Sequence, residues 1–169
     1  YSNRGLTYLY NLDDQEKALS DFNTAVAIAK ENDNNNNFKE YNLDYYLLKR
    51  AYYFEYIEDY DKAILDLTKC IELEPENANY YVARGDVYRC IKKYDLALAD
   101  YEKSFELSAD KDDKTIALNN RAIVYGNQGN YDLAVAEYTR AIEIDPQEPL
   151  YYSNRGLTYL YNLDDQEKA

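Results

Sequence analysis

The stretch YVARGDVYRCIKKYDLALADYEKS, residues 81–104, contains two helical patterns separated by a break. Tyr81, Gly85 and Tyr88 recur at i, i+4 and i+7, which places an apolar and small-residue stripe on one helix face. The polar letters KKYD interrupt this pattern, and a second helical stripe follows from Ala97 onward. The stretch therefore predicts two antiparallel helices joined by a short turn.

This pattern recurs along the whole chain. Its small residue stands at Gly5, Ala51, Gly85, Ala122 and Gly156, which are 46, 34, 37 and 34 residues apart. Self-similarity at this period is typical of stacked repeats, in which each unit buries its apolar face against its neighbours.

The first 18 residues are identical to the last 18, Tyr152 to Ala169, at an offset of 151 residues. The chain thus contains one turn of a larger block and the opening of the next. It begins with Tyr and contains no Met, so we expect a fragment of a long array of near-identical blocks. An engineered tandem is the alternative.

The repeated unit resembles the tetratricopeptide repeat family. It has a large residue, a small Gly or Ala, an aromatic, a second Ala, another aromatic and a closing Pro such as Pro75 or Pro146. No Trp occupies the first large position, and the first unit has an extra turn residue and no closing Pro. The resemblance implies an all-α fold, an α-α superhelix built as a right-handed solenoid of stacked antiparallel helix pairs.

We expect a single solenoid over residues 1–169. Its units are predicted at about 1–31, 38–77, 78–111 and 115–148, with a partial unit at 149–169. The helix pairs are predicted at 1–12 with 15–31, 38–57 with 60–73, 78–92 with 95–109, and 115–128 with 131–144, followed by a helix at 149–162 and another from about Asp165. Because Asn favours turns, Glu31–Asn37 is predicted to be a surface loop, and Asp110–Asp113 a solvated connector.

The composition argues against several classes of function. With 32 acidic and 19 basic residues the formal net charge is −13, so nucleic acid and anionic membranes are poor partners, and the apolar runs are too short for membrane insertion. The absence of His excludes Ser-His-Asp and Cys-His catalysis and His-containing zinc sites. Cys70 and Cys90 are both predicted to be buried as small apolar side chains. We predict no enzyme, no metal and no cofactor.

An arginine precedes the small residue in each full unit, and an acidic residue stands 16 or 17 positions later. These spacings predict four ion pairs within the helix pairs: Arg4–Asp21, Arg50–Asp66, Arg84–Asp100 and Arg121–Glu137. We expect them to set the register of the two helices, since exposed ion pairs contribute only about 0–1 kcal/mol.

In this family the first helices of successive units line a concave groove, and the resemblance places one set of side chains there. They are Leu6, Leu9, Tyr10, Tyr45, Leu48, Tyr52, Tyr56, Asn79, Val82, Asp86, Arg89, Asn119, Ile123, Asn127, Ser153, Leu157, Leu160 and Tyr161. Contiguous apolar and aromatic side chains of this kind suit a peptide or protein segment, which is the predicted partner. Asp86, Arg89 and the Asn residues would set its orientation.

Residues 152–156, YSNRG, also resemble the Asn-containing segment of repeats that clamp the carboxylate of a peptide. That clamp needs cationic side chains, but the corresponding positions include Leu48, Tyr52, Ala83 and Ile116. The carboxylate clamp is therefore not favoured, and Asn3, Asn120 and Asn154 are interpreted as structural residues of the family.

The alternative function is self-assembly. The last helix repeats the first, so it could replace or stack beside the opening helix of another copy through Tyr152, Gly156 and Tyr159. Such a contact is heterologous and does not close, which would give head-to-tail association.

Overall fold

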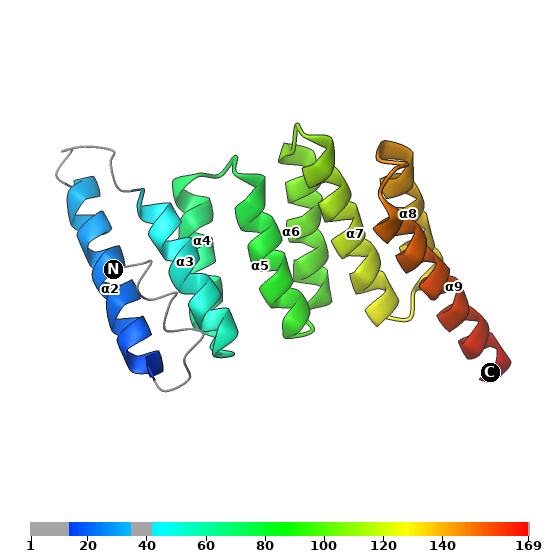
Figure 1. Cartoon of the computed structure of the whole chain (residues 1–169), viewed down its shortest axis with the longest axis horizontal. Helices are drawn as coiled ribbons and strands as arrows, with labels where there is room; N and C mark the ends of the chain where they lie inside the picture. The colour runs from blue at the N-terminus through cyan, green and yellow to red at the C-terminus, as the bar shows by residue number, and fades with distance from the viewer. Residues whose placement is uncertain (1–13, 35–41, 169) are drawn as a thin grey trace. The chain divides into compact units, whose positions relative to one another are not determined.

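The computed structural model describes residues 14–34 and 42–168, and every secondary-structure element in these ranges is an α-helix (Figure 1). In chain order the helices are α2 (Gln15–Asn34), α3 (Leu43–Tyr56), α4 (Tyr60–Leu73), α5 (Ala78–Cys90), α6 (Tyr94–Leu107), α7 (Lys111–Asn127), α8 (Tyr131–Ile144) and α9 (Pro149–Lys168). The all-α prediction is confirmed. The chain divides into an N-terminal part that ends at Glu76 and a C-terminal part that begins at Asn77.

In the N-terminal part, α3 pairs with α4, and α2 packs against α3. The fully buried ring of Phe22 on α2 lies 5.5 Å from the ring of Tyr53 on α3, centre to centre. The Tyr53 hydroxyl donates a hydrogen bond of 2.9 Å to the carbonyl oxygen of Gln15. The buried pair of rings, together with the hydrogen bond of the Tyr53 hydroxyl, therefore holds α2 against α3.

In the C-terminal part, α5 pairs with α6 and α7 with α8, while α6 also packs against α7 and α8 against α9. Ala97 and Tyr101 on α6 form a buried cluster with Val124 on α7. Ala122 on α7 forms another with Ala134 and Tyr138 on α8. Small residues facing aromatic rings let neighbouring helices approach closely, which explains the alternation seen in the sequence.

The turns inside the three described pairs share one construction. Two residues after the end of each first helix stands a residue with positive φ: Glu58 at 60°, Lys92 at 59° and Gly129 at 75°. In the first turn, the amide of Asp59 donates to the carbonyl of Phe54 at 2.8 Å, and the same bond recurs one and two pairs later. This is the Schellman ending of a helix, which reverses the chain in three residues.

Three of the four predicted ion pairs are present. The nitrogen–oxygen distances are 2.7 Å for Arg50–Asp66, 2.8 Å for Arg84–Asp100 and 3.3 Å for Arg121–Glu137. All three carboxylates are buried. Removing one partner of such a pair costs about 3–5 kcal/mol, so these pairs matter more than exposed ones. The fourth pair involves Arg4, which lies outside the described residues.

The connector predicted at Asp110–Asp113 is wrong, because α7 begins at Lys111. The Asp110 side chain caps this helix by accepting a hydrogen bond of 2.7 Å from the amide of Asp112. Two acidic residues in the first turn, Asp112 and Asp113, also interact favourably with the positive end of the helix dipole. The acidic run therefore starts a helix.

Two further boundaries differ from the prediction. The loop predicted from Glu31 is wrong for residues 31–34, because α2 continues to Asn34; residues 35–41 lie outside the described part. The second helix expected near Asp165 is also wrong, because α9 continues to Lys168. The segment from Asn162 to Lys168 contains neither Gly nor Pro, so nothing in its sequence stops a helix.

Candidate functional site

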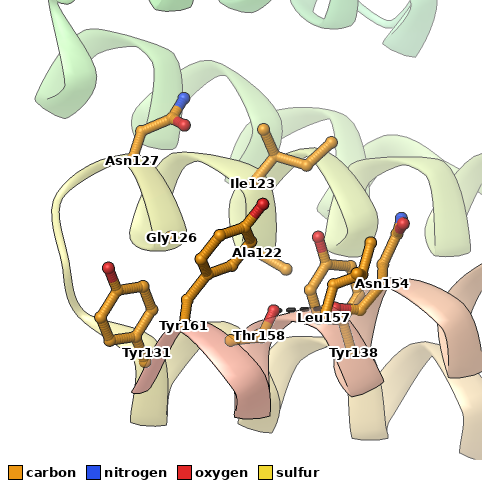
Figure 2. A pocket seen from close by; sticks show the side chains of 10 residues that line it. All are labelled: Ala122, Ile123, Gly126, Asn127, Tyr131, Tyr138, Asn154, Leu157, Thr158 and Tyr161. Atoms are coloured by element: carbon orange, nitrogen blue, oxygen red, sulfur yellow. Dashed lines mark hydrogen bonds between the residues drawn. The ribbon is translucent and has the colours of Figure 1, made fainter. Parts of the chain in front are cut away.

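A cleft of about 370 Å³ lies in the C-terminal part, between α7 and α9. Its walls are apolar, aromatic and amide side chains, and none of them is charged. The lining residues are Ala122, Ile123, Gly126, Asn127, Tyr131, Tyr138, Asn154, Leu157, Thr158 and Tyr161 (Figure 2).

Two walls are built from first helices of consecutive pairs, α7 and α9, and Tyr131 and Tyr138 of α8 complete the lining. In Figure 2, Tyr161 extends from α9 toward Ile123 on α7, and Asn127 lies one turn further along α7. Because Ile123 and Asn127 are four residues apart, as are Leu157 and Tyr161, each wall presents one helical stripe to the cleft. Leu157 and Tyr161 are both exposed, so the cleft is open to a ligand.

Hydrogen bonds hold the polar members of the cleft in place. The Asn154 side-chain amide donates to the Asn119 oxygen at 3.0 Å, which ties α9 to α7. The Thr158 hydroxyl donates to the carbonyl of Asn154 at 2.8 Å. Burial raises the pKa of the Tyr138 hydroxyl, so this group stays protonated at neutral pH. These uncharged groups can donate or accept hydrogen bonds without presenting a charge to a ligand.

The structure brings four of the predicted groove residues together in this cleft: Ile123, Asn127, Leu157 and Tyr161. Asn119 does not line it but holds Asn154. Ser153 and Leu160 are exposed on α9 but do not line the cleft. The binding role of all of them stays a prediction.

Sequence reasoning did not assign Gly126, Tyr131, Tyr138 and Thr158 to the groove. Gly126 follows Ala122 by four residues, and Thr158 precedes Tyr161 by three. Helical spacing was therefore the signal in the sequence that could have assigned Gly126 and Thr158 to the cleft. Tyr138 also takes part in the packing between α7 and α8. It is nearly fully buried among Ala122 and Ala134, and it also borders the cleft.

In the N-terminal part, the predicted groove residues Tyr45, Leu48, Tyr52 and Tyr56 follow one another along α3. The three tyrosines are exposed, whereas Leu48 is half-buried. The ring of Tyr45 meets Tyr46 edge-on, with 5.2 Å between centroids, and the Lys49 ammonium lies 5.2 Å from its centre. This row is a second aromatic surface. Leu6, Leu9 and Tyr10 lie outside the described residues.

On α5 the predicted groove residues are engaged with the protein itself. The Tyr101 hydroxyl donates to the Asp86 carboxylate at 2.8 Å, and the Arg89 guanidinium lies 3.2 Å from the same carboxylate oxygen. Val82 packs against the buried cluster around Tyr101. Asn79 is exposed. Asp86 and Arg89 therefore fix the α5–α6 pair, whatever further contacts they make.

The residues predicted for self-association share the opposite face of α9. Tyr152 is 45% exposed and Tyr159 is 49% exposed. A Cβ atom added at Gly156 would meet nothing within 4 Å.

Neither cysteine forms a disulfide, and the two differ in environment. Cys70 is buried, as predicted, and its thiol donates to the carbonyl of Asp44 at 3.3 Å. Cys90 is exposed, so the prediction for it was wrong. It stands at the end of α5, two residues after Tyr88, and its side chain is exposed.

The described ranges contain no cluster of three or more His, Cys, Asp or Glu side chains placed to hold a metal ion. None of the helices in these ranges combines the length and the apolar character needed to span a bilayer.

Comparisons with known proteins agree with this architecture. No curated protein matches the sequence. The crystal structure of MamA protein superimposes with a TM-score of 0.64 at 23% identity, over 98% of this chain and 88% of that chain. The first TPR domain of human RPAP3 gives a TM-score of 0.64 at 21% identity, over 75% of this chain and 96% of that chain.

A third structure is the first TPR of Spaghetti (RPAP3) bound to the HSP90 peptide SRMEEVD. Its TM-score is 0.61 at 20% identity, over 69% of this chain and 90% of that chain. At these identities the similarity establishes the fold, an α-α superhelix of stacked helix pairs.

Two family models match the sequence itself, both described as tetratricopeptide repeat. One covers residues 45–77 and the other residues 76–147, and together they span more than half of the chain. The repeat spacing, the paired helices and these matches agree: the chain belongs to the tetratricopeptide repeat family.

Proposed function

We propose that this protein is a non-catalytic protein-interaction scaffold that binds a peptide or protein segment in the cleft between α7 and α9. The observation that carries the proposal is the cleft itself, uncharged and aromatic, with walls from the first helices of two consecutive pairs. Apolar clefts with a few fixed polar groups are the usual form of a recognition site. The RPAP3 domain with the same fold binds a peptide, which supports a peptide ligand here.

The ligand differs in chemistry from the acidic peptide SRMEEVD. No Lys or Arg lines the cleft, so a ligand carboxylate would have no cationic partner there. Asn154 already donates to Asn119. The net charge of −13 also disfavours the approach of acidic chains. We infer that the ligand is a peptide segment with apolar or aromatic anchor residues, and that its remaining residues are neutral or basic.

Leu157 and Tyr161 are the side chains expected to contribute most. Both are exposed before binding and both face the cleft, so a ligand would bury them. Truncation of a well-buried interface anchor costs about 2 kcal/mol or more, which corresponds to about a 30-fold loss of affinity.

The test uses acetylated and amidated dodecapeptides in which Leu or Phe anchors alternate with Lys or with Glu. Fluorescence anisotropy should show binding of the Lys series and much weaker binding of the Glu series and of SRMEEVD. Leu157→Ala and Tyr161→Ala should each weaken binding of the Lys series by at least about tenfold.

The matched control is Leu133→Ala. Leu133 on α8 is 50% exposed, against 49% for Leu157, but it does not line the cleft. Its removal should leave affinity unchanged. If Leu133→Ala and Leu157→Ala weaken binding equally, or if the Glu series binds better, the cleft is not the site proposed.

The aromatic row on α3 is proposed as a further ligand surface in the N-terminal part. Tyr52 and Tyr56 are both exposed there and lie one helical turn apart. Replacing both with Ala should weaken binding of the same peptides without lowering helicity in circular dichroism. Unchanged affinity would restrict the binding site to the C-terminal part.

A further inference from the structure

We propose that the carboxylate of Asp86 on α5, here called the α5 subsite, binds a lysine or arginine side chain of the ligand and so determines its specificity. This proposal rests on the proposed function, because it names one ligand residue beside the anchor held in the cleft between α7 and α9. It adds a charged subsite to a cleft whose own lining is uncharged.

Asp86 stands at a register position that lines the cleft on the next two first helices. Two such positions exist, two and six residues after the repeated arginine. The first is occupied by Asp86, Ile123 and Leu157, and the second by Cys90, Asn127 and Tyr161. The α7 and α9 members of both sets line the cleft. Because α5 also packs against α7, we infer that Asp86 and Cys90 continue the ligand surface onto α5.

The α5 subsite is accessible and charged. The Asp86 side chain is 32% exposed, and Cys90, one helical turn further along α5, is also exposed. Asp86 and Arg89 are the charged members of the set of residues that the family resemblance places in the groove. Asp86 is therefore the member of that set that can attract a cation.

One oxygen of the Asp86 carboxylate is available to a ligand. The Tyr101 hydroxyl donates to Oδ1 at 2.8 Å, and the Arg89 guanidinium donates to the same oxygen at 3.2 Å. No described residue donates a hydrogen bond to Oδ2. Since an ionised carboxylate has about four acceptor sites, the two contacts on Oδ1 can hold the group in place while Oδ2 accepts from the ligand.

Glu137 shows that a carboxylate of this protein can bind two cations at once. Its Oε1 atom lies 3.3 Å from a nitrogen of Arg121 and 3.1 Å from a nitrogen of Arg140. Among the described residues, Asp86 pairs with one cation, Arg89. An ammonium or guanidinium group of the ligand would give Asp86 the same arrangement. The net charge of −13 also favours the approach of a basic segment.

The order of the helices predicts how far the basic residue lies from the anchor. Packed helices are about 8–10 Å apart, so the middle of the cleft is about one and a half spacings, or about 12–15 Å, from α5. An extended chain advances about 3.3 Å per residue and covers this distance in about four residues. The ligand should therefore carry its basic residue about four positions from the apolar anchor.

The test is a double-mutant cycle between the protein and two acetylated, amidated peptides. Each has a Phe-Leu anchor with Gly and Ser elsewhere, and Lys stands about four residues before the anchor in one peptide and about four residues after it in the other. In at least one of them, Lys→Gln should weaken binding to the parent protein about fivefold, and binding to Asp86→Asn by less than about twofold.

Asp86→Asn retains an oxygen for the Tyr101 hydroxyl, and urea unfolding checks that the fold is kept. The charge-matched control is Asp95→Asn. Asp95 is exposed on the second helix α6, so this variant removes the same charge away from the first-helix surface. It should show the same Lys-to-Gln difference as the parent.

Cys90 provides a second measurement, of where the ligand chain lies. A peptide with a chloroacetyl group two positions beyond its Lys can alkylate a nearby thiol, because the sulfur displaces chloride and forms a thioether. Mass spectrometry should show modification of Cys90 at least about tenfold faster than by the same peptide without its Phe-Leu anchor.

The outcomes separate this proposal from the proposed function. An equal effect of Lys→Gln on the parent and on Asp86→Asn, or alkylation of Cys90 that does not depend on the anchor, would overturn the α5 subsite. The cleft would still stand in that case if binding is lost in Leu157→Ala. Failure of every peptide to bind would overturn both.

Discussion

Gly85 offers a sharp test of the packing between first and second helices. A Cβ added there would lie 2.7 Å, 3.0 Å and 3.2 Å from the Cε1, Cδ1 and Cζ atoms of Tyr101. The Tyr101 ring is fully buried, and its hydroxyl donates to Asp86 at 2.8 Å. The ring cannot move away without stretching that hydrogen bond. Gly85→Ala should therefore destabilise the fold, although Ala is the better helix former.

The magnitude follows from two opposing terms. Ala in place of Gly favours a helix interior by about 1 kcal/mol. Overpacking costs about 1–3 kcal/mol, and a hydrogen bond to a charged group contributes about 1.5–3 kcal/mol if Tyr101 loses it. The net expectation for Gly85→Ala is a loss of about 1–2 kcal/mol. At Gly156 the same substitution meets nothing within 4 Å, so only the favourable term remains.

The assay is urea unfolding followed by circular dichroism at 222 nm, comparing midpoints because stacked repeats need not unfold in one step. Gly85→Ala should lower the midpoint, and Gly156→Ala should leave it unchanged or raise it. Adding Tyr101→Leu to Gly85→Ala copies the Ala51 and Leu67 combination of the preceding pair and should cost less than the two single changes together. A Gly85→Ala variant more stable than the parent would refute the argument.

Three further predictions concern single side chains. Burial raises the pKa of the Cys70 thiol to about 12, so Ellman's reagent should modify Cys90 promptly and Cys70 only after unfolding. Burial, and after it the charge of Asp86, raises the pKa of the Tyr101 hydroxyl above its ordinary value of about 10. Tyr101 therefore ionises in the unfolded chain before it does so in the folded chain, and the stability of the fold should fall as the pH rises past about 10. The decrease in the urea midpoint between pH 9 and pH 11 should be smaller in Tyr101→Phe. Asp110→Ala removes the cap of α7 and should lower stability by about 1 kcal/mol in the same urea assay, whereas Asp110→Asn should retain most of it.

Helix boundaries could be predicted where the helical spacing of the apolar residues and the residues of the flanking turns indicated the same positions. Residues 60–73 and 131–144 form helices with the predicted bounds, because each is enclosed between a Schellman turn and a Pro soon after its end. The acidic run at Asp110 was misinterpreted because Asp favours both loops and helix starts, and only its position relative to the following apolar stripe distinguishes them.

The site was predictable only in part, because helical spacing determines which face a residue occupies but not what neighbouring side chains do there. The family resemblance assigned Ile123 and Leu157 to the groove, and both line the cleft between α7 and α9. Asp86 fitted the same pattern, yet its carboxylate accepts a hydrogen bond from Tyr101 and forms an ion pair with Arg89. That outcome depends on the tyrosine hydroxyl of another helix, which repeat spacing does not encode.

The repeated arginine has a structural role that an aliphatic residue could not fill. Arg50 reaches Asp66 in its own pair and also donates to Asn23 of the preceding helix at 2.9 Å. Arg121 does the same, pairing with Glu137 and bonding Glu102 of the preceding helix.

Asn23, Glu102 and Thr139, the partner of Arg155, occupy one register position, two residues beyond the acid of their own helix. A forked guanidinium can make both contacts at once, whereas a lysine ammonium is a single point of charge. Arg50 and Arg121 therefore each fix two registers, that of their own helix pair and that of the junction with the preceding helix. Among the described residues, Arg155 has only the second of these contacts, the hydrogen bond to Thr139.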